Sequence, residues 1–140
     1  MSPHSKFIPT KVQNCFVTSE PFTEKLCIEN TDYVFVFGDN ESRYGRGGQA
    51  VIRFCANALG LPTKKSPYEY WSDDEFEHNK SVIDVSIKAI QSWMKPPYNR
   101  KIVFSSNGYG NGLAELPKRA PNTYEYLIHQ LNTNFGTKYV

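Results

Sequence analysis

Two glycine-rich stretches hold the residues of this chain that are best suited to bind a ligand. The first, here called the first glycine loop, contains Gly45, Gly47 and Gly48, followed by Gln49 and Ala50. The second glycine loop is Ser106-Asn107-Gly108-Tyr109-Gly110-Asn111-Gly112-Leu113. Glycine lets a ligand approach the backbone closely, and successive backbone N–H groups form nests that bind anions. The two loops therefore predict a site that could cradle a diphosphate.

Polar, charged and aromatic side chains near the loops are further candidates. Asp39 and Asn40 could hydrogen-bond to a base or a ribose, and Arg43 and Arg46 could offset phosphate charge. Four aromatic residues could stack on a flat ring: Tyr68, Tyr70, Trp71 and Tyr109. Each candidate also has a structural alternative, because Asp, Asn and Gly make turns and caps, loop arginines are solvated, and aromatic side chains cover core edges.

The elements that would position these residues alternate between strands and helices. Apolar runs at 33–37 and 101–105 have the composition of strands buried on both faces, and each leads into one glycine loop. Apolar residues at helical spacing predict helices at 51–59, 79–94 and 116–131, the first of them ended by Gly60. Weaker patterns predict a strand at 14–18, a helix at 22–28, an extended segment at 61–67 and a strand or tail at 137–140.

This order of elements predicts an α/β domain. In a sheet of parallel strands both glycine loops would lie at the carboxyl edge, where α/β proteins bind their ligands. A length of 140 residues indicates one domain over residues 1–140, with residues 1–12 as a flexible arm.

Motifs and composition exclude several kinds of site and partner. The chain has no P-loop, no in-frame G-x-G-x-x-G and no H-E-x-x-H, and His4, His78 and His129 are expected at the surface, so no metal site and no cofactor are predicted. A net charge of +2 argues against nucleic acid as a simple electrostatic partner, and no apolar run reaches the length of a membrane span. Three cysteines without a pairing pattern and a polar N-terminus predict a cytoplasmic protein.

In order and spacing, residues 33–131 resemble a macrodomain, the α/β/α module that binds ADP-ribose. The resemblance is closest to the branch that removes ADP-ribose from acidic side chains. The matching features are Gly45-Arg46-Gly47-Gly48-Gln49-Ala50, Thr63-Lys64-Lys65, Asn79, and Gly110-Asn111-Gly112-Leu113 followed by Leu116. The chain is also similar to small uncharacterised phage and bacterial proteins with the pattern GDN…GRGGQA…PTK…GLA.

The resemblance implies a three-layer α/β/α fold with a mixed sheet flanked by helices. It also implies that ADP-ribose, or a nucleotide derived from it, binds in a cleft between the two glycine loops. Adenine would lie near Asp39, the diphosphate between the loops, and the distal ribose near Asn40, Asn107 and Lys64. The protein would then recognise ADP-ribosylated macromolecules or sequester a free ADP-ribose-like molecule.

Two other functions stay open. An ADP-ribosyl hydrolase would use Lys64 together with Glu115, because the position at which the resemblance calls for an aspartate is Ala114. In a non-enzymatic interaction module both glycine loops would be simple turns, and the loop aromatics would contact a protein or single-stranded nucleic acid.

Overall fold

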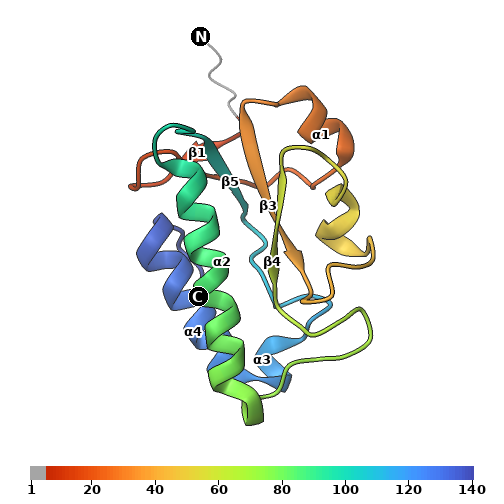
Figure 1. Ribbon diagram of the computed structural model, residues 1–140. Helices are drawn as coiled ribbons and strands as arrows, with labels where there is room; N and C mark the ends of the chain where they lie inside the picture. The colour runs from red at the N-terminus through yellow and green to blue at the C-terminus, as the bar shows by residue number, and fades with distance from the viewer. Residues whose placement is uncertain (1–5) are drawn as a thin grey trace.

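Five strands form one mixed sheet at the centre of the molecule (Figure 1). The structure is a computed structural model that describes residues 6–140. In spatial order the strands are β1 (Ile8–Pro9), β2 (Cys15–Thr18), β5 (Lys101–Ser105), β3 (Tyr33–Asp39) and β4 (Ala58–Pro62). β1 runs antiparallel to β2, whereas β2, β5, β3 and β4 all run parallel to one another. The carboxyl ends of β3, β4 and β5 therefore point to one edge of the sheet.

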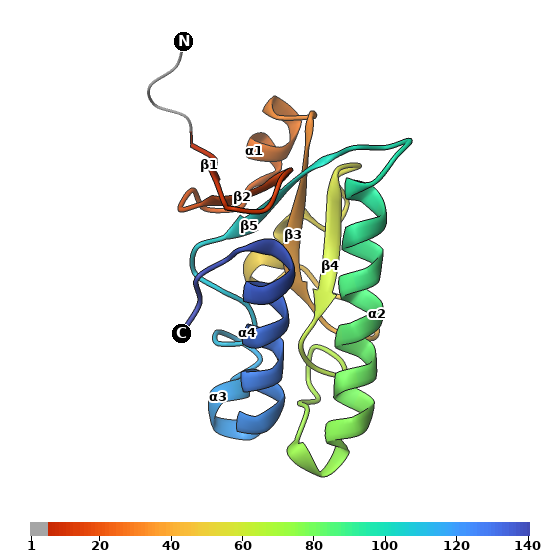
Figure 2. The ribbon, with the colours of Figure 1, turned by 90° about the vertical axis from the view of Figure 1, so that its left-hand side faces the viewer.

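Helices cover both faces of this sheet (Figure 2). α2 (Phe76–Met94) and α4 (Pro121–Phe135) cover one face, while α1 (Glu24–Glu29) and the short 3₁₀ helix η1 (Gly48–Ile52) cover the other. Two short helices, η2 (Asp73–Glu75) and α3 (Leu116–Arg119), come just before α2 and α4 in the chain. The three-layer α/β/α fold expected from the sequence is confirmed.

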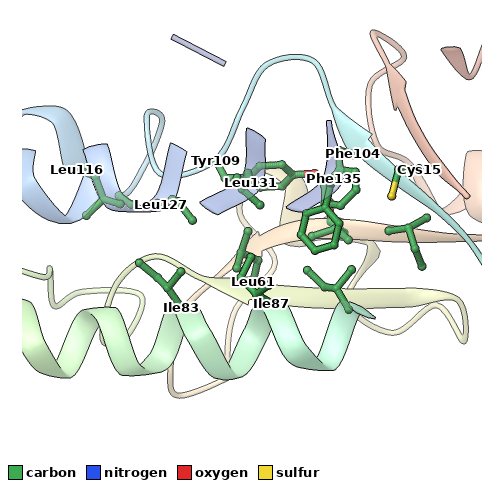
Figure 3. Packing of buried hydrophobic residues seen from close by; sticks show 14 of the residues in the cluster. Cys15, Leu61, Ile83, Ile87, Phe104, Tyr109, Leu116, Leu127, Leu131 and Phe135 are labelled. Atoms are coloured by element: carbon green, nitrogen blue, oxygen red, sulfur yellow. Dashed lines mark hydrogen bonds between the residues drawn. The ribbon is translucent and has the colours of Figure 1, made fainter. Parts of the chain in front are cut away.

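The alternation of side chains along the strands explains the two layers of core. Val34 and Val36 of β3 belong to the cluster that includes α2 and α4, whereas Phe35 and Phe37 belong to the cluster with α1 and η1. Successive residues of a strand point to opposite faces of the sheet, so a continuous apolar run fills both layers. Side chains from α2, α4 and the strands meet in the first of these clusters (Figure 3).

The prediction of a helix at 51–59 is wrong. η1 ends at Ile52, and Ala58–Pro62 forms strand β4, which pairs with β3. Gly60 therefore lies within a strand and does not end a helix. A Cβ atom at this position would lie only 2.2 Å from Oδ2 of Asp39, so the glycine makes room for a side chain of the neighbouring strand. A short apolar run fits both the helical repeat of about 3.6 residues and the strand repeat of two residues. Here pairing with β3 makes the segment a strand.

The single helix expected at 116–131 is two helices. α4 begins with Pro121, which has no N–H group to continue the hydrogen bonds of α3. The first turn of α4 is capped from a distant part of the chain. The carboxylate of Asp73 in η2 accepts hydrogen bonds from the N–H groups of Asn122, at 2.9 Å, and Thr123, at 3.0 Å.

The ends of the chain differ in part from the expectation. Residues 1–5 of the expected flexible arm lie outside the described residues. Residues 6–12 of the expected arm are attached to the domain, so the prediction is wrong for them. Ile8–Pro9 pairs with β2, and the Phe7 side chain is buried against the sheet. Residues 136–140 form no strand. Within residues 6–140, no helix combines the length and the apolar character needed to cross a membrane.

Candidate functional site

A cavity of about 440 Å³ opens at the carboxyl edge of β3, β4 and β5. Its walls come from the residues that follow these three strands, and they include both glycine loops. The three strands are parallel neighbours in the sheet, so the segments that leave them meet at one place.

Most of the predicted site residues line this cavity. They are Asp39, Asn40, Gly45, Gly47, Gly48, Gln49, Ala50, Lys64, Asn107, Gly108, Tyr109, Gly110, Asn111, Gly112 and Leu113. Ser106 and Glu115 are not among its lining residues. The N–H group of Ser106 donates to the carbonyl of Thr18 at 2.8 Å, and the carboxylate of Glu115 pairs with Arg119 at 2.9 Å. Ala114, the position of the missing aspartate, does line the cavity.

The carboxylate of Asp39 is committed to holding the first glycine loop. It is buried and accepts hydrogen bonds from the guanidinium groups of Arg53, at 2.5 and 3.1 Å, and Arg43, at 3.1 Å. Arg53 also donates to the carbonyls of Tyr44 and Gly45, at 3.2 and 2.7 Å. Arg53 is thus a structural centre of the first loop. It was not among the predicted residues, since an arginine in an expected helix carries no signal of this role.

Two amide side chains keep the two loops in place. Gln49 accepts a hydrogen bond from the N–H group of Gly38 at 2.7 Å and donates to the carbonyl of Gly108 at 3.1 Å, so it joins the first loop to the second. Asn40 donates to the carbonyl of Tyr44 at 2.8 Å and orders the turn before the first loop.

An apolar contact also joins the loops. A Cβ atom at Gly47 or Gly48 would lie 3.3 Å from Cδ1 of Leu113, so this leucine of the second loop lies against the backbone of the first. Gly38, Tyr44 and Pro67 line the cavity as well and were not predicted as site residues. Tyr44 and Pro67 each stand beside a motif, and Gly38 is the last residue before the predicted Asp39 and Asn40.

Many backbone N–H groups of the two loops have no acceptor within residues 6–140. They belong to residues 45–49 of the first loop and to residues 109–114, in and just after the second. Gly110 and Ala114 are buried residues that line the cavity. Buried N–H groups are nearly always paired, with water or a ligand where no protein acceptor is present. The loops thus have the donors that an anionic ligand needs.

Lys64 is the one cationic residue in the cavity lining formed by the described residues. Its ammonium group donates to the carbonyl of Pro67 at 3.1 Å and lies 5.1 Å from the centre of the Tyr70 ring. The guanidinium group of Arg119 lies over the same ring at 3.6 Å. Lys65 instead pairs with Glu75 at 2.5 Å, so the two lysines have different environments.

Two of the four candidate aromatics belong to the core. The Tyr109 side chain is 1% exposed, and its hydroxyl donates to the carbonyl of Val36 at 2.7 Å. Burial, followed by the neighbouring Tyr139, raises the pKa of Tyr109 well above its usual value. Trp71 is also buried and donates to Glu41 at 2.8 Å. The side chains of these two residues belong to the core, and Tyr109 also borders the cavity. Tyr70 lines the cavity, and Tyr68 is exposed.

Histidines lie away from the cavity wherever the structure describes them. His4 falls among residues 1–5, His78 bonds to Glu41 at 2.8 Å, and His129 lies on α4. Among residues 6–140, no group of three His, Cys, Asp or Glu side chains is arranged to hold a metal ion.

Comparison with known proteins places the chain in a family. A family model matches residues 17–130, which include β3, β4, β5 and both glycine loops. The chain belongs to DUF7831, a family of unknown function. No curated protein and no solved structure matches the chain.

Proposed function

We propose that this protein binds ADP-ribose, or a nucleotide derived from it, in the cavity between the two glycine loops. One observation carries the proposal: both loops have N–H groups without an acceptor in the part of the chain that the structure describes, and both loops border the same cavity. Such donors suit the oxygens of a diphosphate. A cavity of about 440 Å³ is also within the range of about 300–1,000 Å³ that is common for small-ligand sites.

The charges of the lining support an anionic ligand. Among the described residues, Asp39 is the one carboxylate of the lining, and two guanidinium groups offset its charge. Lys64 then adds a positive charge. In our proposal the diphosphate lies between the loops and the distal ribose near Asn107 and Lys64. Asp39 has a structural role, since both of its carboxylate oxygens already accept hydrogen bonds.

The biological use that we propose is recognition of ADP-ribosylated macromolecules or sequestration of a free ADP-ribose-like molecule in the cytoplasm. Cys15, Cys27 and Cys55 are all free thiols, which agrees with a reducing compartment.

Hydrolysis of an ADP-ribosyl bond has weaker support than binding. Lys64 lines the cavity, but Glu115 does not, and its carboxylate is paired with Arg119. The methyl group of Ala114 can neither transfer a proton nor stabilise a cation. An interaction module with simple turns also has weaker support, because it gives no reason for so many unpaired N–H groups around one cavity.

Calorimetry with ADP-ribose tests the proposal. We expect the wild-type protein to bind ADP-ribose, and to bind adenosine, which lacks the phosphates, far more weakly. Lys64→Gln should weaken ADP-ribose binding roughly 10- to 100-fold, because one charge-assisted hydrogen bond is lost. Lys65→Gln is the matched control and should bind as the wild type does, since Lys65 pairs with Glu75.

An absence of both heat and thermal shift at millimolar ADP-ribose would refute the proposed function. A peptide carrying ADP-ribosylated glutamate distinguishes binding from hydrolysis. The binding proposal expects the peptide to be retained intact, as measured by mass spectrometry, whereas release of ADP-ribose that depends on Lys64 would establish the hydrolase.

A further inference from the structure

The two strands that carry the glycine loops separate before they end. β3 and β5 pair through Tyr33–Lys101, Val34–Ile102 and Phe35–Val103, and the pairing stops there. Both strands nevertheless continue, β3 to Asp39 and β5 to Ser105. Gly38 and Asp39 at the end of β3 line the cavity, as does the loop that follows β5, so the gap between the strands lies beside the cavity.

A tyrosine hydroxyl fills this gap. The hydroxyl of Tyr109 accepts a hydrogen bond from the N–H group of Ser105 at 2.8 Å and donates to the carbonyl of Val36 at 2.7 Å. It therefore replaces the direct bond that continued pairing of the strands would have made. Tyr109 itself belongs to the second glycine loop, so the loop is fastened to the two strands at this point.

A second tyrosine holds the same serine from the other side. The hydroxyl of Tyr139 donates to the carbonyl of Ser105. That carbonyl also accepts a hydrogen bond from the N–H group of Gly108 at 3.2 Å, which closes the turn that starts the second loop. The rings of Tyr139 and Tyr109 meet edge to face, with centres 6.1 Å apart. Burial raises the pKa of Tyr139, so its hydroxyl remains a donor at neutral pH.

The segment that carries Tyr139 is firmly attached to α4. Asn132 accepts hydrogen bonds from the hydroxyl of Thr137, at 2.8 Å, and the N–H group of Tyr139, at 2.9 Å. Its amide also donates to the carbonyl of Tyr139 at 2.8 Å. The Tyr139 ring is thereby fixed relative to the rest of the domain.

We infer that Tyr139 is a positioning residue that holds the second glycine loop in its ligand-binding shape from outside the cavity. Tyr139 is absent from the cavity lining, so it acts through Ser105 and Tyr109. Its effect on the loop stands on the contacts above, whereas its effect on ligand affinity rests on the proposed function.

Hydrogen exchange and calorimetry of Tyr139→Phe test this inference. The substitution keeps the ring and removes only the hydroxyl that bonds to Ser105. We expect the amides of residues 105–108, which are hydrogen-bonded within the protein, to exchange several-fold faster in the variant without ligand. The affinity for ADP-ribose should fall roughly three- to tenfold, as for loss of one ordinary hydrogen bond. Tyr126→Phe is the matched control, because Tyr126 donates to Asp84 between α4 and α2, away from the cavity.

Each result has a defined meaning. Unchanged exchange of residues 105–108 in Tyr139→Phe, or an equal increase in Tyr126→Phe, overturns the inference. Faster exchange with unchanged ADP-ribose affinity would overturn the claim that Tyr139 supports ligand binding through the second glycine loop. If the wild-type protein does not bind ADP-ribose, the proposed function fails, and hydrogen exchange still decides whether Tyr139 holds the loop.

Discussion

Gly110 occupies a position in the second glycine loop where a side chain cannot fit. Its φ of +81° is in the left-handed region, and a Cβ atom there would lie 2.5 Å from Cδ1 of Leu116. Leu116 is fully buried, so it has no room to move aside. Glycine at this position is therefore a requirement of packing and backbone conformation together.

Gly110→Ala should destabilise the protein by roughly 2–4 kcal/mol, because backbone strain and overpacking add. Gly112→Ala is the matched control in the same loop. No atom lies within 4 Å of the Cβ position at Gly112, so its effect should stay within about 0.5 kcal/mol. Urea unfolding of the two variants measures the difference, and equal free energies of unfolding would contradict the packing argument.

Individual residues of the site were predictable to different degrees. The glycine loops could be predicted because each comes after a buried strand. Lys64 could be predicted because Thr63-Lys64-Lys65 matches a feature of the macrodomain resemblance. The side-chain partners were not predictable, because they depend on packing between distant segments. The pairing of Asp39 with Arg53 is of this kind, and it makes the Asp39 carboxylate unavailable to a ligand. The pairing of Glu115 with Arg119 is local, four residues apart, but it forms only because a helix begins at Leu116, just after Glu115.

Among the elements, α4 depends on a residue far away in the chain for its first turn. Asp73 accepts hydrogen bonds from the N–H groups of Asn122 and Thr123 and from the hydroxyl of Thr123. Burial acts to raise the pKa of Asp73, but these hydrogen bonds outweigh it and lower the pKa below the usual value of 3.8. The stabilisation by ionised Asp73 is therefore complete above that value and is lost as the pH falls through the lowered pKa.

Asp73→Asn should remove this part of the pH dependence. We expect the free energy of unfolding of the variant to fall less steeply than that of the wild type when the pH is lowered from 5 towards 2, as followed by urea unfolding. Asp74→Asn is the control, since the Asp74 side chain makes no hydrogen bond within residues 6–140. A wild-type-like pH profile for Asp73→Asn would show that the cap does not contribute through its charge.

Some elements could be predicted from the sequence, and others could not because, like the first turn of α4, they depend on residues far away in the chain. The strands at 33–37 and 101–105 and the long helix ending at Met94 have strong patterns of their own, and all three are confirmed. The strand β4 is set by its pairing with β3, and the first turn of α4 after Pro121 is capped by Asp73, and both partners lie elsewhere in the chain. A local apolar pattern does not contain that information.

For the whole molecule, the cysteines report whether both core layers unfold together. Cys15 lies in the layer with α2 and α4, and Cys27 in the layer with α1 and η1. Burial raises the pKa of Cys15 to about 12, and burial together with the neighbouring Cys55 raises that of Cys27 to about 12. Both thiols are thus buried and protonated at pH 8, and the reactive thiolate is scarce.

Iodoacetamide at pH 8 should label the partly exposed Cys55 in the native protein and leave the other two cysteines to react only on unfolding. If the domain unfolds as one unit, Cys15 and Cys27 will be labelled at the same rate when each is corrected for its unfolded-state reactivity. Mass spectrometry of peptides from a time course measures the rates. Clearly different corrected rates would show that one layer opens independently.

The place of β5 in the sheet has a consequence for how the molecule is built during synthesis. β5 lies between β2 and β3, and it is synthesised after the four other strands of this sheet. Until residues 101–105 are present, β1–β2 and β3–β4 are two separate pairs with no strand to join them. The nascent chain therefore exposes the unpaired edges of β2 and β3 until residues 101–105 have been synthesised, and the cavity, which includes residues 107–114, forms only after that.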